Sequence, residues 1–551
     1  MLKSELLLPG GNFRKIKTAM LYGADSVYAG TPDMSLRAKS ELSLEDLIAV
    51  SHLTKKNNKK LYLTLNLFSH NKDIEKLPSF LDTVAKVNPD GLLIADPGIF
   101  AYFRKHMPNM NLHISTQANV CSSLSVDFWK DQGASLCVLA REVSFEEITE
   151  IKQQCKNIKI EAFVHGSMCM TYSGRCLLSN FMAERGANQG SCAHSCRWDY
   201  KVKIRLKDNK IFELNLNEEN KDLFNFYLEE EFREGEYYPI EEDGMGSYIL
   251  NSKDLCLMPV LDDYLKLGVD TLKIEGRNKS EYYAAITARS YRYAIDAWYK
   301  DPENWNYKPY MEELNTIQNR GYTLAFHKGR LTNLGHNYDT SGTLSSYMFA
   351  GIVVDYDKDH LIMEIKNLLN AGDILEFISP FFMEPIRLRM YDFIETETGD
   401  HKSKIAPGKA NQTINIPLAL FHNENKENIK NILPLYSVVR KLNFKAESNL
   451  FLKQNNVAFK VENNKASQNI LTKVKKELNL HLNEEELKKA SQVQGLTNKQ
   501  QNKSFKSIDD ACCSKGCNGC LVFWNDEKYA ALREKLKQKK SGEMLIKNID
   551  F

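Results

Sequence analysis

The first third of the chain repeats one short unit, an apolar run that ends at a polar residue or glycine and is followed by a segment with helical periodicity. Runs this short, rich in Val, Ile, Leu and Tyr, are typical of buried parallel strands. Seven runs precede residue 166 and an eighth follows a long gap: Glu5–Pro9, Ser26–Gly30, Leu61–Asn66, Gly91–Asp96, Leu112–Gln117, Leu136–Arg141, Ile158–His165 and Thr271–Arg277. Amphipathic segments such as 44–57 and 144–155 lie between them, and Ser43 and Ser144 are expected to cap these two helices.

Eight strand–helix units predict an α/β fold, a (β/α)8 TIM-like barrel. An open doubly wound sheet is the alternative, but no GxGxxG follows the first strand, which disfavours a dinucleotide-binding fold. In barrels of this kind the chemistry lies at the carboxyl ends of the strands. Those ends carry polar residues here: Asn66, Asp96, Gln117, Asn119, Arg141, Glu142, His165, Glu275 and Arg277.

Directly after the seventh predicted strand, the stretch 164–199 holds four of the twelve cysteines, namely Cys169, Cys176, Cys192 and Cys196. Four glycines interrupt this stretch, so most of it cannot form a continuous helix. Four thiolates around one point suit tetrahedral zinc or an iron–sulfur cluster, and the seven-residue step between the first two favours a cluster held by a loop. Four unrelated buried thiols are the alternative. The sequence therefore predicts a metal site at the mouth of the barrel.

The rest of the chain divides by composition and period. A stretch of 105 residues separates His165 from Thr271, and it contains the hairpin-like KVKIRLKDNKIFELNL and one further candidate thiol, Cys256. The predicted barrel thus spans 1–340. From about Ser345 the apolar period changes to two, which predicts a small antiparallel β-barrel over 345–446. Residues 447–505 are rich in Asn, Lys and Gln and predict a flexible linker before a cysteine-rich basic tail, 506–551.

The tail contains Cys512, Cys513, Cys517 and Cys520, two of them at CxxC spacing. They are candidates for a second metal site, zinc or iron–sulfur, with idle thiols as the alternative. The net charge of the chain is only +2, yet residues 451–551 carry 19 Lys and Arg against 12 Asp and Glu. A basic tail on a near-neutral body indicates contact with a polyanion such as RNA, although a solvated Lys-rich linker explains the charge equally well.

Composition limits the compartment and the class of chemistry. No apolar run reaches the roughly 18 residues that span a membrane, and no signal-peptide pattern opens the chain, so we expect a cytoplasmic protein without membrane contact. Twelve cysteines in a reducing compartment favour metal or redox chemistry over disulfides. Neither HExxH nor GxSxG is present, and a metal site would consume the thiolates that a cysteine protease needs.

Four stretches resemble the collagenase-like (PrtC-type) peptidase family: HGSMCMTYSGRCLLSNFM…NQGSCAHSCRW, ELLLPGGNFRKIKTAMLYGADSVYAG, NSKDLC…KIEGRNKSEYYAA and IKNLLNAGDILEFISP. The resemblance covers roughly residues 1–445. Within that family the pattern is most similar to RNA hydroxylases, which act on tRNA uridine with prephenate or on cytidine of 23S rRNA and are associated with a [4Fe–4S] cluster. It implies an enzyme that forms 5-hydroxyuridine at the tRNA wobble position. Hydroxylation of rRNA cytidine and peptidase activity are the alternatives.

The resemblance also assigns cluster ligands. Cys169, Cys176 and Cys192 match the cysteine positions of the family, and either Cys196 or Cys256 supplies the fourth ligand.

Charged residues at the strand ends are candidates for the rest of the site. Arg141 and Arg277 are expected to bind the two carboxylates of prephenate, since the guanidinium fork matches carboxylate geometry. His165 and Glu275 are candidates for proton transfer, and Arg175, which lies between two cluster cysteines, for fixing an anionic donor. Structural hydrogen bonds and salt bridges are the alternative role for each.

Overall fold

The computed structural model describes residues 3–31, 42–67, 69–168, 252–329, 345–408, 412–421 and 426–442, with short pieces between 172 and 248. The chain falls into two units, Met1–Leu452 and Lys453–Phe551, and the described residues belong to the first. Several predictions fall outside them: the four loop cysteines, Arg175, the linker, and the tail with its four cysteines.

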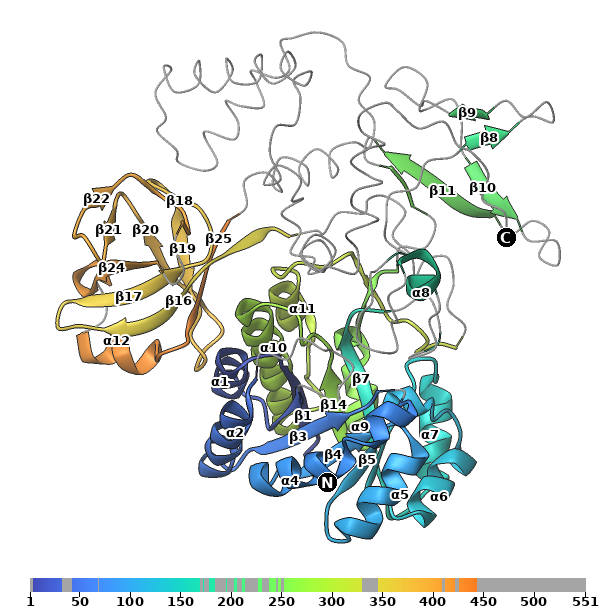
Figure 1. The fold of residues 1–551 in the computed structure, drawn as a ribbon. Helices are drawn as coiled ribbons and strands as arrows, with labels where there is room; N and C mark the ends of the chain where they lie inside the picture. Colours follow the sequence, from blue (N-terminus) through green and yellow to red (C-terminus); the bar gives the residue numbers. More distant parts are fainter. Residues whose placement is uncertain are drawn as a thin grey trace, which may run out of the picture. The chain divides into compact units, whose positions relative to one another are not determined.

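Eight parallel strands close into a barrel (Figure 1). The strand β14 pairs with β7 on one side and with β1 on the other, which closes the ring. The TIM-like barrel predicted from the repeated unit is therefore confirmed, and the open doubly wound alternative is wrong. In order around the barrel the strands are β1 (Glu5–Gly10), β2 (Ser26–Gly30), β3 (Lys60–Leu65), β4 (Gly91–Ile94), β5 (Leu112–Ile114), β6 (Leu136–Val138), β7 (Lys159–Gly166) and β14 (Thr271–Ile274).

Helices cover the outside of the barrel (Figure 1), and local sequence sets where they begin. Ser43 and Ser144 each form a capping box with the acidic residue three positions later, as predicted. Asp96 accepts hydrogen bonds from two backbone amides and so caps a helix at the barrel mouth. The helices are α1 (Phe13–Leu21), α2 (Leu44–Lys56), α3 (Asn71–Ile74), α4 (Leu77–Val87), α5 (Pro97–His106), α6 (Ser123–Asp131), α7 (Phe145–Gln154), α9 (Leu261–Leu267), α10 (Glu281–Lys300) and α11 (Lys308–Leu314).

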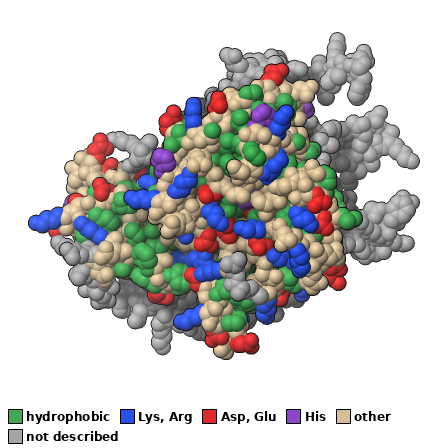
Figure 2. All heavy atoms as spheres, turned by 90° about the horizontal axis from the view of Figure 1, so that it is seen from below, with side chains coloured by type: hydrophobic (Ala, Val, Ile, Leu, Met, Phe, Trp, Pro, Cys, Tyr) green, Lys and Arg blue, Asp and Glu red, His purple; other side chains and the backbone are tan. Residues whose placement is uncertain are grey.

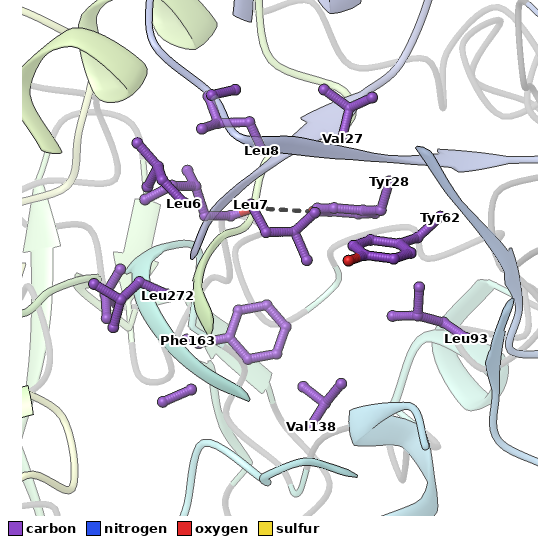
Figure 3. Close-up of a cluster of buried hydrophobic side chains, with 14 of the residues drawn as sticks. Leu6, Leu7, Leu8, Val27, Tyr28, Tyr62, Leu93, Val138, Phe163 and Leu272 are labelled. Atoms are coloured by element: carbon purple, nitrogen blue, oxygen red, sulfur yellow. Dashed lines mark hydrogen bonds between the residues drawn. The ribbon is translucent and has the colours of Figure 1, made fainter. Parts of the chain in front are cut away.

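Side chains fill the interior of the barrel. Figure 3 shows residues from six strands turned into one common interior, and none is more than 8% exposed: Leu7, Tyr28, Tyr62, Leu93, Val138 and Phe163. Burying one such apolar side chain contributes about 1.5–3 kcal/mol to folding. One ion pair is buried with them, between Lys273 Nζ and Glu161 Oε1 at 2.6 Å. Because the centre is packed, a ligand can reach this interior only from an end of the strands.

The insert between β7 and β14 extends the barrel wall beside β7. Its strand β13 (Asp254–Cys256) runs antiparallel to β7, and β15 (Tyr322–Thr323) pairs with β13 in parallel. Earlier in the insert, β8 (Lys203–Arg205) and β9 (Ile211–Glu213) form the predicted hairpin. The remaining elements are α8 (Leu178–Ala183) and the antiparallel strands β10 (Phe226–Glu229), β11 (Tyr237–Asp243) and β12 (Gly246–Tyr248).

The segment after the barrel forms an antiparallel sheet, drawn in yellow and orange in Figure 1, as the period-two pattern predicts. It has eight strands, in the order β20-β19-β25-β16-β17-β24-β21-β22, and it curves as a half-barrel over its own apolar core. Its strands are β16 (Tyr347–Tyr356), β17 (His360–Ile365), β19 (Ile374–Phe377), β20 (Ile386–Arg389), β21 (Phe393–Glu395), β22 (His401–Lys402), β24 (Thr413–Pro417) and β25 (Val438–Leu442). The same segment contains α12 (Lys426–Ile432) and a separate two-stranded sheet of β18 (Leu369–Asn370) and β23 (Lys404–Ile405).

A buried charged network joins this sheet to the barrel. Glu313 accepts from Arg289 of α10 at 2.7 Å and from Arg440 of β25 at 3.1 Å. Arg440 also bonds Glu376 of the sheet at 2.7 Å, and all four side chains are at most 8% exposed. Removing one partner would leave a buried charge uncompensated, so the network fixes the sheet against α10.

The described surface is mixed in charge. On the face seen in Figure 2, Lys and Arg side chains are interspersed with Asp and Glu. Across the described ranges, no helix is both long and apolar enough to cross a membrane.

Candidate active site at the barrel mouth

Three cations gather around two aromatic rings at the carboxyl end of the barrel. The guanidinium carbon of Arg141 lies 3.8 Å from the ring centroid of Phe163. Lys273 Nζ lies 4.6 Å from the ring centroid of Tyr28 and 5.3 Å from that of Phe163. The guanidinium carbon of Arg277 lies 5.7 Å from the centroid of Tyr28. We call these five residues the cation–aromatic cluster; they come from β2, β7, β14 and the residues that follow β6 and β14.

Neighbouring strands hold the cluster in place. Arg277 donates to the Thr64 hydroxyl of β3 at 3.0 Å, and Lys273 bonds Glu161 of β7. Burial lowers the pKa of Lys273, and the nearby guanidinium groups of Arg277 and Arg141 lower it further, against the opposing effect of Glu161. Burial likewise raises the pKa of the Glu161 carboxyl. Both directions mean that this interior disfavours charge on the ion pair.

The cluster has the chemistry of a site for an anion. Guanidinium groups bind carboxylate or phosphate through paired hydrogen bonds, and the two buried rings hold the cations in place from behind. The predicted candidates Arg141 and Arg277 therefore lie in one cluster, brought together from β6 and β14.

His165 lies outside this cluster. The pairing of β7 with β14 is irregular: Phe163 faces Lys273, but His165 faces the very next residue, Ile274. The imidazole consequently lies among tyrosine rings of α10 and β15, with centroids 5.4–5.9 Å away. It is 1% exposed, and burial lowers its pKa to about 4, so the ring is neutral at pH 7. Its Nδ1 has no hydrogen-bond partner among the described residues.

Glu275 meets the end of β7 where the cysteine loop begins. Its backbone N–H donates to the His165 carbonyl at 2.8 Å, and its carboxylate accepts from the Ser167 N–H at 3.4 Å. Tyr283 of α10 donates to its carbonyl at 2.7 Å. Gly166 makes this approach feasible, because a Cβ at its position would lie 2.6 Å from Glu275 Cβ. The structure thus brings His165 and Glu275 together at the end of β7.

Cys256 is a buried thiol. It pairs with His165 in register across β13 and β7, yet its Sγ contacts Tyr291 Oη at 3.9 Å and Met311 Sδ at 3.8 Å. It is 1% exposed, and burial raises the pKa of the thiol to about 12. These apolar surroundings favour the thiol form of Cys256 over the thiolate.

The four loop cysteines form a donor set that fits an iron–sulfur cluster or tetrahedral zinc. The described start of that loop, up to Met168, leaves the carboxyl end of β7 beside Glu275. The ligand set itself, like Arg175 and the tail cysteines, lies outside the described residues and stays a prediction.

Sequence reasoning missed Lys273, Tyr28, Phe163 and Thr64. Lys273 could have been found from the sequence, because it is a charged residue between Leu272 and Ile274 in a strand predicted to be buried. The other three are ordinary strand residues, and only the closed barrel brings them to one point.

The fold is a closed α/β barrel, with cations and aromatic rings at the carboxyl ends of its strands and a cysteine-rich sequence directly after β7. Residues 11–337 match the family model Peptidase family U32, and the chain belongs to that family. The resemblance seen in the sequence is thereby confirmed.

Relatives of known name support the same assignment. The "tRNA hydroxylation protein P" of Escherichia coli (strain K12) is 37% identical over 401 residues, which cover 69% of this chain and 87% of that protein. The "tRNA hydroxylation protein P1" of Bacillus subtilis (strain 168) is 36% identical over 382 residues, covering 69% and 84%. The "Collagenase" of Porphyromonas gingivalis (strain ATCC BAA-308 / W83) is 28% identical over 398 residues, covering 68% and 86%.

Proposed function

We propose that this chain hydroxylates a pyrimidine of tRNA, forming 5-hydroxyuridine at the wobble position. One observation carries the proposal: relatives named for tRNA hydroxylation share 36–37% identity with this chain over 84–87% of their own length. The cation–aromatic cluster supports it, because a nucleotide has an anionic backbone and guanidinium groups such as those of Arg141 and Arg277 bind phosphate. An anticodon loop exposes its bases, so turning one toward a barrel mouth costs little.

We propose prephenate as the co-substrate, held by Arg141 and Arg277. Its two carboxylates need two cationic partners, and these guanidinium groups lie over neighbouring rings of one cluster. Thr64 orients the second of them through its hydroxyl. The rings of Phe163 and Tyr28 lie behind these guanidinium groups and support them.

The proposed metal site is a [4Fe–4S] cluster on Cys169, Cys176, Cys192 and Cys196. When bound, such a cluster supplies one-electron redox chemistry. Cys196 is preferred to Cys256 as the fourth ligand, because the Cys256 thiol is buried against Tyr291 and Met311 and its pKa is raised.

The chain's own residues order the start of the loop. The Glu275 carboxylate accepts a hydrogen bond from the Ser167 N–H. Glu275 and the neutral His165 are proposed to take part in proton transfer at this end of β7. Arg175, between two of the proposed ligands, is proposed to fix an anionic group. For the tail cysteines we propose a second metal site, zinc or iron–sulfur, within a segment whose positive charge attracts RNA.

Peptidase activity is the weaker candidate. The relative named collagenase is less similar, at 28% identity. Cys256 and His165 pair in register, but a thiol with its pKa raised to about 12 is not a nucleophile at neutral pH. The buried imidazole is likewise closed to a peptide substrate.

The test is nucleoside mass spectrometry of tRNA and 23S rRNA from cells that lack the chain, with the restored gene as the control. Loss of 5-hydroxyuridine from tRNA, regained on restoration, supports the proposal. Loss of a hydroxylated cytidine from rRNA alone would assign the enzyme to the other substrate. Unchanged tRNA and rRNA would refute a role in RNA hydroxylation.

A further inference from the structure

Lys273 is unusual among the lysines of the barrel, because its ammonium-bearing end lies inside the strand ring. The residue is 4% exposed, and its Nζ faces the rings of Tyr28 and Phe163. Its hydrogen-bond partner is the Glu161 carboxylate at 2.6 Å, and Glu161 is fully buried. Burying an ion pair costs desolvation free energy that the pairing only partly offsets. Apolar residues of similar volume would therefore stabilise the fold at least as well.

Two further features make this amine suited to covalent chemistry. Arg141 and Arg277 stand over the same two rings, so carboxylate-binding groups lie beside the amine. Burial and these two guanidinium groups lower the pKa of Lys273, while burial raises the pKa of Glu161. Desolvation and neighbouring cations are the two ways in which proteins make a lysine nucleophilic near neutral pH.

We propose that Lys273 forms an imine with the carbonyl group of a 2-oxo carboxylic acid whose carboxylate is held by Arg141 and Arg277. The class of ligand follows from the groups present: an amine selects a carbonyl, and a guanidinium next to it selects a carboxylate one bond away. This deepens the proposed function and rests on it for its biological ligand, because prephenate is itself a 2-oxo acid.

The step balances without an oxidant. The neutral Nζ adds to the carbonyl carbon, and a C–N bond forms. Glu161 passes one proton from the nitrogen to the carbonyl oxygen, which gives a carbinolamine. Glu161 then passes the second nitrogen proton to the hydroxyl group, the C–O bond breaks, and water leaves. The sum is one amine and one ketone giving one imine and one water, and water reverses the reaction.

The experiment traps the imine on the full-length protein with pyruvate as the probe and sodium cyanoborohydride as the reductant. Intact mass spectrometry should show a gain equal to pyruvic acid less one oxygen atom, and peptide mapping should place it on Lys273. Lys273→Met should lose the part of the gain that maps to residue 273 in the wild-type protein. Lys279→Met is the matched control, because Lys279 Nζ also lies over an aromatic ring, 5.5 Å from the centroid of Tyr283, but outside the cluster, so its adduct should persist.

Absence of an adduct on the wild-type protein, or an adduct mapped only to other lysines, would overturn the proposal. Mapping on the wild-type protein decides the question even if Lys273→Met does not fold. The assay contains no RNA, so it can fail separately from the proposed function. An adduct on Lys273 with unchanged nucleosides in the deletion strain would keep the imine and reject the hydroxylase, and the reverse pair of results would reject the imine alone.

Discussion

Replacing Gly166 by alanine should disturb the point where the cysteine loop leaves the barrel. Gly166 ends β7 with a φ of +128°, and a Cβ there would lie 2.6 Å from Glu275 Cβ and 2.8 Å from the Glu275 carbonyl oxygen. The unfavourable φ alone costs a residue with a side chain about 1–3 kcal/mol. Forcing apart a packed contact adds about 1–3 kcal/mol. We therefore expect Gly166→Ala to lower the free energy of unfolding by about 2–6 kcal/mol.

Gly372→Ala separates these two contributions. Gly372 has a φ of +95°, but nothing lies within 4 Å of the position of its Cβ, so only the backbone cost should appear. Urea unfolding of both variants measures the difference, and iron content after anaerobic reconstitution should fall for Gly166→Ala alone. Equal unfolding free energies for the two variants would show that the end of β7 shifts away from Glu275 at no cost. The close contact of Gly166 with Glu275 would then not hold the start of the loop in place.

Other expectations follow from buried charge and from the tail. Burial lowers the pKa of His113 to about 3, so its imidazole takes up a proton near pH 6.5 in the unfolded chain but not in the folded chain. The free energy of unfolding should therefore fall by about 2 kcal/mol from pH 7 to pH 5. His113→Gln should flatten that part of the pH dependence of urea unfolding. Arg440→Met should cost about 3–5 kcal/mol in the same assay, whereas Arg387→Met, which removes an exposed partner of the same Glu376, should cost under about 1 kcal/mol. Deleting residues 500–551 should weaken RNA binding and flatten its salt dependence in filter-binding titrations.

The barrel was predictable because parallel strands buried on both faces appear in the sequence as short apolar runs, and the first runs, such as Glu5–Pro9 and Ser26–Gly30, follow that rule. Charged residues interrupt the last two runs, Ile158–His165 and Thr271–Arg277. Helix starts were predictable for a local reason, since Ser43 and Ser144 bond within their own first turn. The antiparallel sheet was predictable because apolar residues alternate with polar ones along its strands.

The site was only partly predictable, because its geometry depends on contacts between distant strands. The direction of His165 could not be read from alternation, since an irregular pairing of β7 with β14 turns it away from the interior faced by Phe163. The cluster of Arg141, Lys273 and Arg277 forms only when the ring closes around Tyr28. The type of residue at the strand ends was therefore enough to predict Arg141 and Arg277, but not Lys273.

The cation–aromatic cluster is proposed as the working site of a tRNA hydroxylase. The most direct measurement is the 5-hydroxyuridine content of tRNA from a deletion strain that carries Arg277→Gln, beside the same strain with Arg387→Gln. Arg387 is 54% exposed on the antiparallel sheet and serves as the control, with soluble protein and iron content matched between strains. Arg277→Gln should lose most of the 5-hydroxyuridine, whereas Arg387→Gln should retain the wild-type content. Full modification by Arg277→Gln would contradict the claim.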